Sequence, residues 1–240
     1  MEKNEFYIEF TKKLQEIEIT LNEEQQNQFY MYMNLLIEWN QKINLTAITE
    51  PKEIILKHFI DSLTILKEIK NDSKVIDVGT GAGFPGIPLK IANPSLNIVL
   101  LDSLNKRINF LNEVIEHLKL KSIETIHARI EEVGKNEKYR EQYDVVTSRA
   151  VSNLNVLAEY MLPLTKLGGK CICMKGAEVE EEIENSKNAI NLLGGKILKV
   201  DTFELANENI KRNIVIIKKE KNTPNKYPRK SGTPAKEPLR

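Results

Sequence analysis

The sequence predicts an α/β fold with a mostly parallel, seven-stranded sheet that is closed by an antiparallel pair of strands. From residue 74 onward, short strand-like segments alternate with amphipathic helical segments, which is typical of a parallel sheet covered on both faces. The last two strand-like segments, 194–205 and 212–219, leave no room for a helix between them and should pair antiparallel. At 240 residues with 41% hydrophobic content, the chain can form one such domain plus a small additional subdomain.

The first 70 residues are predicted to form a small helical subdomain. The apolar residues of the first helix recur at helical spacing: Phe6, Phe10, Leu14 and Ile17. A later helix should run from Pro51, a residue type favoured at the first helical position, to about residue 69. We expect this subdomain to be followed by a Rossmann-like domain over residues 71–220 and a tail over residues 221–240.

Five segments of the central region are predicted to be strands because they are short, apolar and rich in β-branched residues. They are KVIDVG (74–79), NIVLLD (97–102), IETIHA (123–128), YDVVTSRA (143–150) and GKCICMKG (169–176). The helix before the fifth strand is expected to end at Gly168 and Gly169. Cys171 and Cys173 alternate along this strand and should be reduced structural thiols, because side chains two apart on a strand are poorly placed to bridge each other.

The tail differs in composition from the rest of the chain. Its 20 residues hold six Lys or Arg against one Glu, a net +5, which leaves −4 for residues 1–220 within the total of +1. Four of the nine prolines lie here and aliphatic side chains are scarce, so we expect a mobile segment that stands apart from the glycine-rich stretch at residues 79–86. Two roles stay open for this tail: a solubilising extension, or a basic arm that lies along RNA phosphates.

Several classes of protein are disfavoured by what the sequence lacks. No run approaches 18 apolar residues, and the charged start MEKNEFYIEF has no signal-peptide core, so we expect a cytoplasmic protein without a membrane partner. The lone C-x-C pattern is not a metal site, and no metal is expected.

A glycine-rich turn follows the first strand in the stretch VIDVGTGAGFPG, residues 75–86. Gly81, Gly83 and Gly86 match the G-x-G-x-x-G pattern of dinucleotide sites, where glycines let the backbone approach a pyrophosphate. Asp77 argues against a dinucleotide. A pyrophosphate charge about 4 Å from this carboxylate would be repelled by about 4 kcal/mol at an effective dielectric near 20.

A cofactor that carries an ammonium and a sulfonium would instead be attracted to Asp77. Asp102, at the end of the second strand, suits the ribose hydroxyls of either cofactor and does not discriminate between them. The sequence therefore favours a methyltransferase that uses S-adenosylmethionine. An NAD-dependent oxidoreductase and a tight turn without a ligand are the alternatives.

Eight stretches carry a more specific signal, in order over nearly the whole chain. They are NLTAI (44–48), KHFIDSL (57–63), VIDVGTGAGFPGIPL (75–89), LLDSLNKRINFL (100–111), ARIEEV (128–133), VTSRAV (146–151), RNIVIIKK (212–219) and TPNKYPRKSGTPAKEPL (223–239). With them the chain resembles the bacterial 16S ribosomal RNA guanine-N7 methyltransferases, also called the glucose-inhibited division protein B family. DSLNKR and YPRKSGTP are the most specific of these motifs.

The resemblance implies a class I, Rossmann-like methyltransferase that uses S-adenosylmethionine. Its target would be the N7 of a guanine in the 530 loop of 16S ribosomal RNA, presented by the small ribosomal subunit or an assembly intermediate. We expect a monomer, although the sequence does not determine the oligomeric state. Guanine N7 has a free lone pair and no proton to lose, so no catalytic base is expected. Catalysis can rest on holding N7 in line with the methyl–sulfur bond.

The resemblance and the strand ends together assign eight residues to the cofactor. Asp77, Gly79, Gly81 and Phe84 should line its methionine part, and Asp102 should hold the ribose.

Three residues farther along the chain complete this assignment. Ile130 and Glu131 match the positions at which members of the family bind the adenine of the cofactor. The alternative for Glu131 is that it is a solvated residue of a helix. Arg149 should face the cofactor or the target base, with a structural ion pair as its alternative.

Six residues are assigned to the RNA substrate: Asn44, His58, Arg129, Arg212, Arg229 and Lys230. Asn44 and His58 match family positions that face the substrate, and a local hydrogen-bonded pair with Asp61 is the alternative for His58. The cations should meet phosphates, with solvated surface charge as the alternative for Arg129 and Arg212. A ribosome-assembly factor with a vestigial methyltransferase fold stays open, although the intact Asp77 and glycine loop argue against it.

Overall fold

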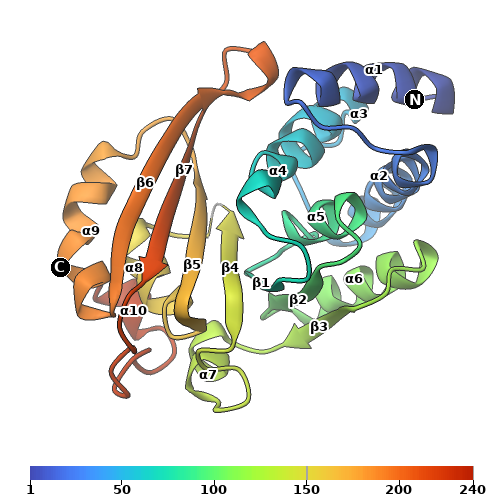
Figure 1. The fold of residues 1–240 in the computed structure, drawn as a ribbon. Coiled ribbons are helices and arrows are strands. Elements are labelled where there is room, and N and C mark those ends of the chain that lie inside the picture. The colour runs from blue at the N-terminus through green and yellow to red at the C-terminus, as the bar shows by residue number, and fades with distance from the viewer. Residues whose placement is uncertain (150, 240) are drawn as a thin grey trace.

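Seven strands form one sheet in the computed structural model of the chain, which describes residues 1–149 and 151–239 (Figure 1). The strand order is β3-β2-β1-β4-β5-β7-β6. The strands are β1 (Lys74–Val78), β2 (Asn97–Asp102), β3 (Ile123–His127), β4 (Tyr143–Arg149), β5 (Thr165–Lys175), β6 (Gly195–Glu204) and β7 (Lys211–Lys219). β1 to β5 are parallel and β7 runs antiparallel to both β5 and β6. The predicted fold class is confirmed.

The centre of the sheet contains the switch point of the topology. Asp77 of β1 pairs with Leu100 of β2 on one side and with Thr147 of β4 on the other. The chain builds outward from β1 to β3 and then returns to place β4 on the opposite side of β1. In open parallel sheets, ligands bind beyond the carboxyl ends of the strands at such a point.

The region before β5 differs from the prediction. The helix α8 (Leu154–Met161) ends at Met161, so the expected helix end at Gly168 and Gly169 is wrong. β5 begins at Thr165, and both glycines lie inside it where the register with β4 shifts. Gly168 has φ +80°, a conformation that glycine adopts without steric cost, which explains why glycine occupies this bulge. The predicted last residue of β4, residue 150, lies outside the described residues.

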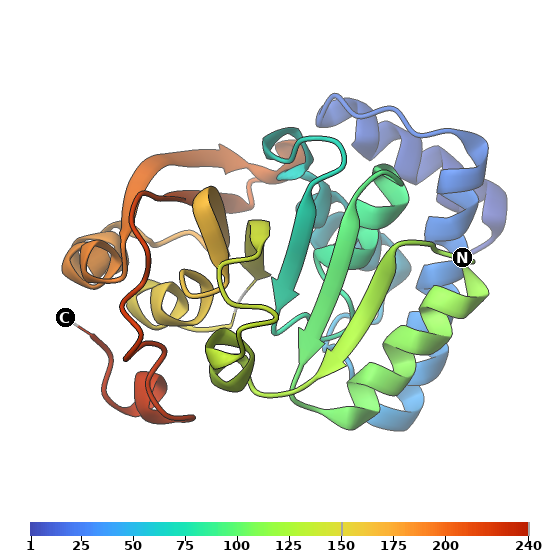
Figure 2. The same cartoon turned by 60° about the horizontal axis from the view of Figure 1, so that its bottom comes forward.

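Helices cover both faces of the sheet (Figures 1 and 2). One face packs against the N-terminal helices together with α5 and α6, and the other against α7, α8 and α9. The N-terminal elements are α1 (Lys3–Glu16), α2 (Glu23–Ile43), α3 (Pro51–Ile54), the π-helical turn η1 (Ile55–Ile60), α4 (Asp61–Leu63) and the 3₁₀ turn η2 (Leu66–Glu68). The others are α5 (Gly86–Ala92), α6 (Asn105–His117), α7 (Ile130–Lys135), α9 (Glu180–Leu192), η3 (Leu205–Asn207) and α10 (Thr233–Lys236).

The N-terminal helices share a continuous aromatic core with the sheet. Phe29 lies 4.8 Å from Phe10 and 5.0 Å from Phe59, measured between ring centroids. Tyr32 continues this cluster to Phe84 of the glycine loop at 5.4 Å, and its hydroxyl donates to the carbonyl of Ala82. The N-terminal helices therefore support the loop directly. The predicted division of the chain at residues 70 and 220 stays a prediction.

The tail packs against the body of the protein. Tyr227 is buried, and the segment continues beside α8 to the short helix α10 (Figure 2). The expectation of a mobile tail is wrong because its backbone and side chains bond to buried polar groups of the body, which composition alone does not reveal. Within the two described ranges, the structure contains no helix that is long and apolar enough to cross a membrane.

Candidate functional site

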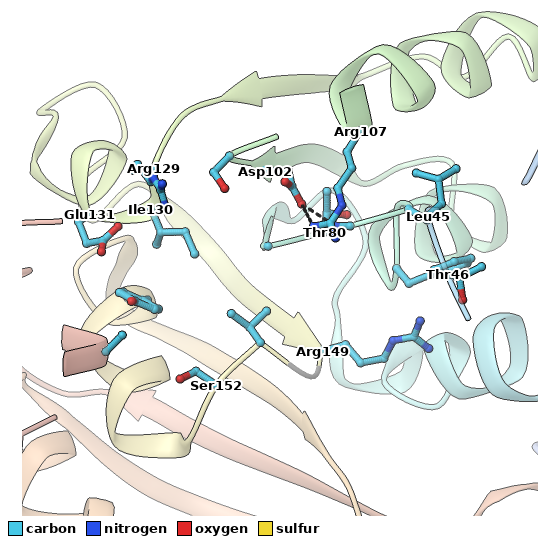
Figure 3. Close-up of a pocket in the computed structure, with 18 of the residues that line it drawn as sticks. Leu45, Thr46, Thr80, Asp102, Arg107, Arg129, Ile130, Glu131, Arg149 and Ser152 are labelled. Atoms are coloured by element: carbon cyan, nitrogen blue, oxygen red, sulfur yellow. Dashed lines mark hydrogen bonds and ion pairs between the residues drawn. The ribbon is translucent and has the colours of Figure 1, made fainter. Parts of the chain in front are cut away.

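A cavity of about 580 Å³ opens at the carboxyl ends of β1, β2 and β4. In Figure 3, Ile130 and Glu131 lie on one side of it, and Thr46 and Arg149 on the opposite side. Seven of the eight predicted cofactor residues line this cavity: Gly79, Gly81, Phe84, Asp102, Ile130, Glu131 and Arg149. The predicted residues are thus brought together, although they come from four separate stretches of the chain.

The glycine loop leaves its backbone exposed to the cavity. Gly81 has φ +63°, and a Cβ built on it would meet no atom of residues 1–149 or 151–239 within 4 Å. Gly86 is different, because a Cβ there would lie 2.3 Å from the Leu100 side chain. Gly81 therefore gives a bound group room to approach the backbone, whereas Gly86 lets the start of α5 pack closely on β2.

Asp77 is the predicted cofactor residue that does not line the cavity. Its carboxylate is fully buried beneath the loop, where Oδ2 accepts from the Thr80 hydroxyl at 2.6 Å and the Gly86 N–H at 2.9 Å. Oδ1 has no partner among the described residues. Burial raises the pKa of Asp77 to about 6, against the lowering effect of these two bonds. The expected direct contact with the methionine part is not supported by this position, and Asp77 instead holds the loop.

Asp102 ends β2 and is bonded on both carboxylate oxygens. Oδ2 accepts from the Gly81 N–H at 3.0 Å and from Arg107 at 3.2 Å (Figure 3). Oδ1 accepts from the Leu104 N–H at 2.9 Å. A carboxylate has about four acceptor positions, so one stays available for a ligand hydroxyl. Arg107 also lines the cavity. It was not predicted as a site residue, although it ends the DSLNKR motif that begins at Asp102.

His58 is held as a neutral imidazole. Arg149 donates to Nδ1 at 3.1 Å, so Nδ1 carries the lone pair, and Nε2–H donates to the Thr46 hydroxyl at 2.9 Å. Burial, together with the charge of Arg149, lowers the pKa of His58 to about 3. The ring also stacks on Phe84 at 4.4 Å between centroids. His58 does not bond to Asp61, so that alternative is wrong.

Two arginines bracket the buried carboxylate of Asp61. Arg149 donates to Oδ2 at 3.1 Å and Arg212 donates to Oδ1 at 2.9 Å. Arg149 also donates to the carbonyl of Lys57 at 2.9 Å and lies over the Phe84 ring at 4.9 Å. Arg149 therefore forms the structural ion pair and also lines the cavity, whereas its contact with the cofactor or the target base stays a prediction.

Glu131 is not a solvated helix residue, so that alternative is wrong. It is buried and lines the cavity, and its Oε1 accepts from the Gly232 N–H of the tail at 2.8 Å. Gly232 and Ala235 line the cavity as well, so the expectation that the tail stands apart from it is wrong. The adjacent Arg129 is exposed at the cavity wall, and its side chain forms no hydrogen bond or ion pair with the other residues that the structure describes.

The remaining predicted RNA residues are separated by the fold. Asn44 ends α2 in the left-handed conformation, is exposed and does not line the cavity. The chain turns at Asn44, and the two residues that follow it, Leu45 and Thr46, line the cavity. Lys230 is exposed on the tail. Arg229 is bound by the carboxylate of Glu159, so its predicted contact with RNA phosphate is not supported.

Comparisons with known proteins agree with this geometry. The profile of the family described as "rRNA small subunit methyltransferase G" matches residues 25–215. A protein of Desulforamulus reducens named "Ribosomal RNA small subunit methyltransferase G" is 53% identical over 98% of this chain and 99% of its own length. A protein of Acetivibrio thermocellus with the same name is 57% identical over 92% of this chain and 91% of its own length.

The fold also resembles solved structures at low sequence identity. A structure described as a SAM dependent methyltransferase from Aquifex aeolicus superposes with a TM-score of 0.55 at 18% identity. The match covers 73% of this chain and 97% of that one. At this identity, the likeness supports the fold alone.

Proposed function

Because this chain belongs to the rRNA small subunit methyltransferase G family, we propose that it methylates a guanine of 16S ribosomal RNA with S-adenosylmethionine as methyl donor. The observation that carries this proposal is the cavity at the switch point of the sheet, where the glycine loop, Asp102 and the start of α7 (Ile130 and Glu131) meet. We further infer that the target atom is N7 in the 530 loop of this RNA.

The residues of the cavity fit such a cofactor. Gly81 offers open backbone and Asp102 keeps an acceptor position for ribose hydroxyls. Ile130 and Glu131 would flank the adenine, and Phe84 with Gly79 would lie along the methionine part. The buried charge of Asp77 beneath the loop favours a cation over a pyrophosphate.

The bound cofactor supplies a methyl group on a positively charged sulfur, and the chain supplies orientation. His58 cannot act as a base, because its Nδ1 lone pair is engaged by Arg149. This suits a nucleophile such as guanine N7 that has no proton to lose. Arg149, held by Asp61 and by the Lys57 carbonyl, would fix the wall against which the base packs.

The RNA would meet cations at the rim of the cavity. Arg129 is exposed there, and Lys230 is exposed on the tail segment two residues before Gly232. Arg212 would contribute less because its side chain is paired with Asp61. We infer that the protein acts as a monomer in the cytoplasm on the small subunit or its assembly intermediate.

Calorimetric titration tests the cofactor assignment. Titration of S-adenosylmethionine into the purified chain should give a binding heat that saturates at one cofactor per chain. Titration of NAD should give no saturable binding. The control is Asp102→Ala, which removes the proposed ribose acceptor and should weaken binding of S-adenosylmethionine. Tight binding of NAD would instead favour the oxidoreductase alternative.

A further inference from the structure

The C-terminal tail contributes to the wall of the cavity, although its composition is that of a solvated extension. Gly232 and Ala235 line the cavity, and Gly232 donates its N–H to Glu131 at 2.8 Å. Gly232 adopts φ +83°, and a Cβ on it would meet no atom of the described part of the chain within 4 Å. The tail thus meets the cavity through backbone, at the side formed by Ile130 and Glu131.

A buried ion pair holds this segment in place. Glu159 of α8 is fully buried, and its carboxylate accepts from the Arg229 backbone N–H at 2.7 Å, from Nε at 2.9 Å and from an Nη at 2.7 Å. Among the described residues, no other side chain donates a recorded hydrogen bond to Glu159. Releasing the tail would leave a buried carboxylate without its cation, which is strongly unfavourable.

A second set of contacts fixes the start of the tail. The guanidinium of Arg140 donates to the carbonyls of Tyr227 at 2.8 Å and Thr223 at 2.7 Å. At the far end, Asn155 donates to the carbonyl of Leu239 at 3.0 Å. These anchors lie outside the cavity, so they hold the tail without competing with a ligand for the same atoms.

We propose that the docked tail completes the cofactor pocket, so that docking of residues 229–235 and binding of S-adenosylmethionine stabilise each other. This inference rests on the proposed function. Gly232 and Ala235 cover the Ile130–Glu131 side of the pocket, and Arg229 holds them there through Glu159. Coupling between two equilibria is reciprocal. The bound cofactor must therefore increase the equilibrium constant for docking of the tail by the same factor by which the docked tail increases the affinity for the cofactor.

Calorimetry on the full chain tests one direction of this coupling. Arg229→Ala should raise the dissociation constant of S-adenosylmethionine at least about fivefold, the lower end of typical coupling between sites. Lys236→Ala is the matched control, because it removes one charge from the exposed part of the same segment, and the Lys236 side chain forms no hydrogen bond or ion pair with another described residue. It should bind like the wild type. Circular dichroism verifies that each variant is folded.

Hydrogen exchange on the wild type tests the other direction and does not depend on any variant. Addition of S-adenosylmethionine should slow amide exchange in residues 226–239, while α1, which is remote in Figure 1, should be unchanged. Equal affinity of folded Arg229→Ala and wild type, or unchanged tail exchange in a wild type that binds the cofactor, would overturn the inference. A wild type that binds no S-adenosylmethionine at all would instead reject the cofactor assignment.

Discussion

Arg149 donates a hydrogen bond to Nδ1 of His58 at 3.1 Å, and this contact determines which tautomer of the imidazole is present. The proton resides on Nε2, which donates to Thr46. The same arginine holds Asp61 and lies over Phe84, so it connects the wall of the cavity with the N-terminal helices. The histidine at the candidate site is therefore a structural group rather than a proton acceptor.

The first prediction concerns the pH dependence of the reaction. The pKa of His58 is lowered to about 3, so this residue stays neutral throughout the physiological range. Single-turnover methyl transfer should be nearly independent of pH between about 6.5 and 8.5, since neither His58 nor guanine N7 has a proton to exchange there. A rate that rises steeply with pH in the wild type and becomes flat in His58→Ala would identify the histidine as a base.

The second prediction concerns stability without cofactor. Burial raises the pKa of Asp77 in the folded state from 3.8 to about 6. Protonated Asp77 therefore stabilises the folded state below about pH 4, and this stabilisation is lost as the pH rises through about 6. Asp77→Asn does not titrate. The free energy of unfolding of this variant, relative to wild type, should rise by about 2–3 kcal/mol between pH 4 and 7.5. Urea denaturation at both pH values measures it, and a difference independent of pH would contradict the assignment.

The third prediction separates two roles of Asp77 in cofactor binding. Asp77→Ala removes the acceptor for Thr80 and Gly86 and should weaken binding of S-adenosylmethionine by about 1.5–3 kcal/mol. Asp77→Asn keeps an acceptor oxygen and should lie closer to wild type, because the carboxylate does not line the cavity. Calorimetry compares the two. If the asparagine variant loses as much affinity for S-adenosylmethionine as the alanine variant, the negative charge of Asp77 contributes directly to cofactor binding.

The fourth prediction concerns RNA binding. Arg129→Ala and Lys230→Ala should each weaken binding to small subunits and reduce the slope of log affinity against log salt by about 0.7 for every phosphate that the variant no longer neutralises. Lys196→Ala removes an equal charge from exposed β6, away from the cavity, and serves as control. Filter binding over a range of salt concentrations gives the slopes. Equal slopes for all three variants and wild type would remove the rim cations from the RNA interface.

The sequence predicted the architecture well where local pattern and long-range packing agree. The second strand ends at Asp102 and a helix begins at Pro51, as expected, because strand ends and helix starts carry their own local signals. The single helix expected to continue to about residue 69 is instead a succession of α3, η1, α4 and η2. The predicted end of α8 is wrong because Gly168 and Gly169 lie in a bulge of β5. A pair of glycines in the sequence is compatible with the end of a helix as well as with a bulge in a strand.

The site was predictable only in part for a related reason. Gly81 and Asp102 lie at strand ends, so their meeting follows from the topology of the sheet. The contacts of Arg229 with Glu159 and of Gly232 with Glu131 join segments that are 70 and 101 residues apart. No local pattern encodes such pairs, and the basic, proline-rich composition of the tail pointed instead to a solvated segment.

The central claim is that this chain methylates N7 of a guanine in 16S ribosomal RNA, and transfer of a tritiated methyl group tests it most directly. The substrate is the small ribosomal subunit lacking this modification, and fully modified subunits are the control. N7-methylguanine can be located by borohydride reduction followed by aniline cleavage of the RNA chain. We predict about one methyl group per unmodified subunit and a single cleavage in the 530 loop. Absence of transfer from a chain that binds S-adenosylmethionine, or label on a base other than guanine, would contradict the claim.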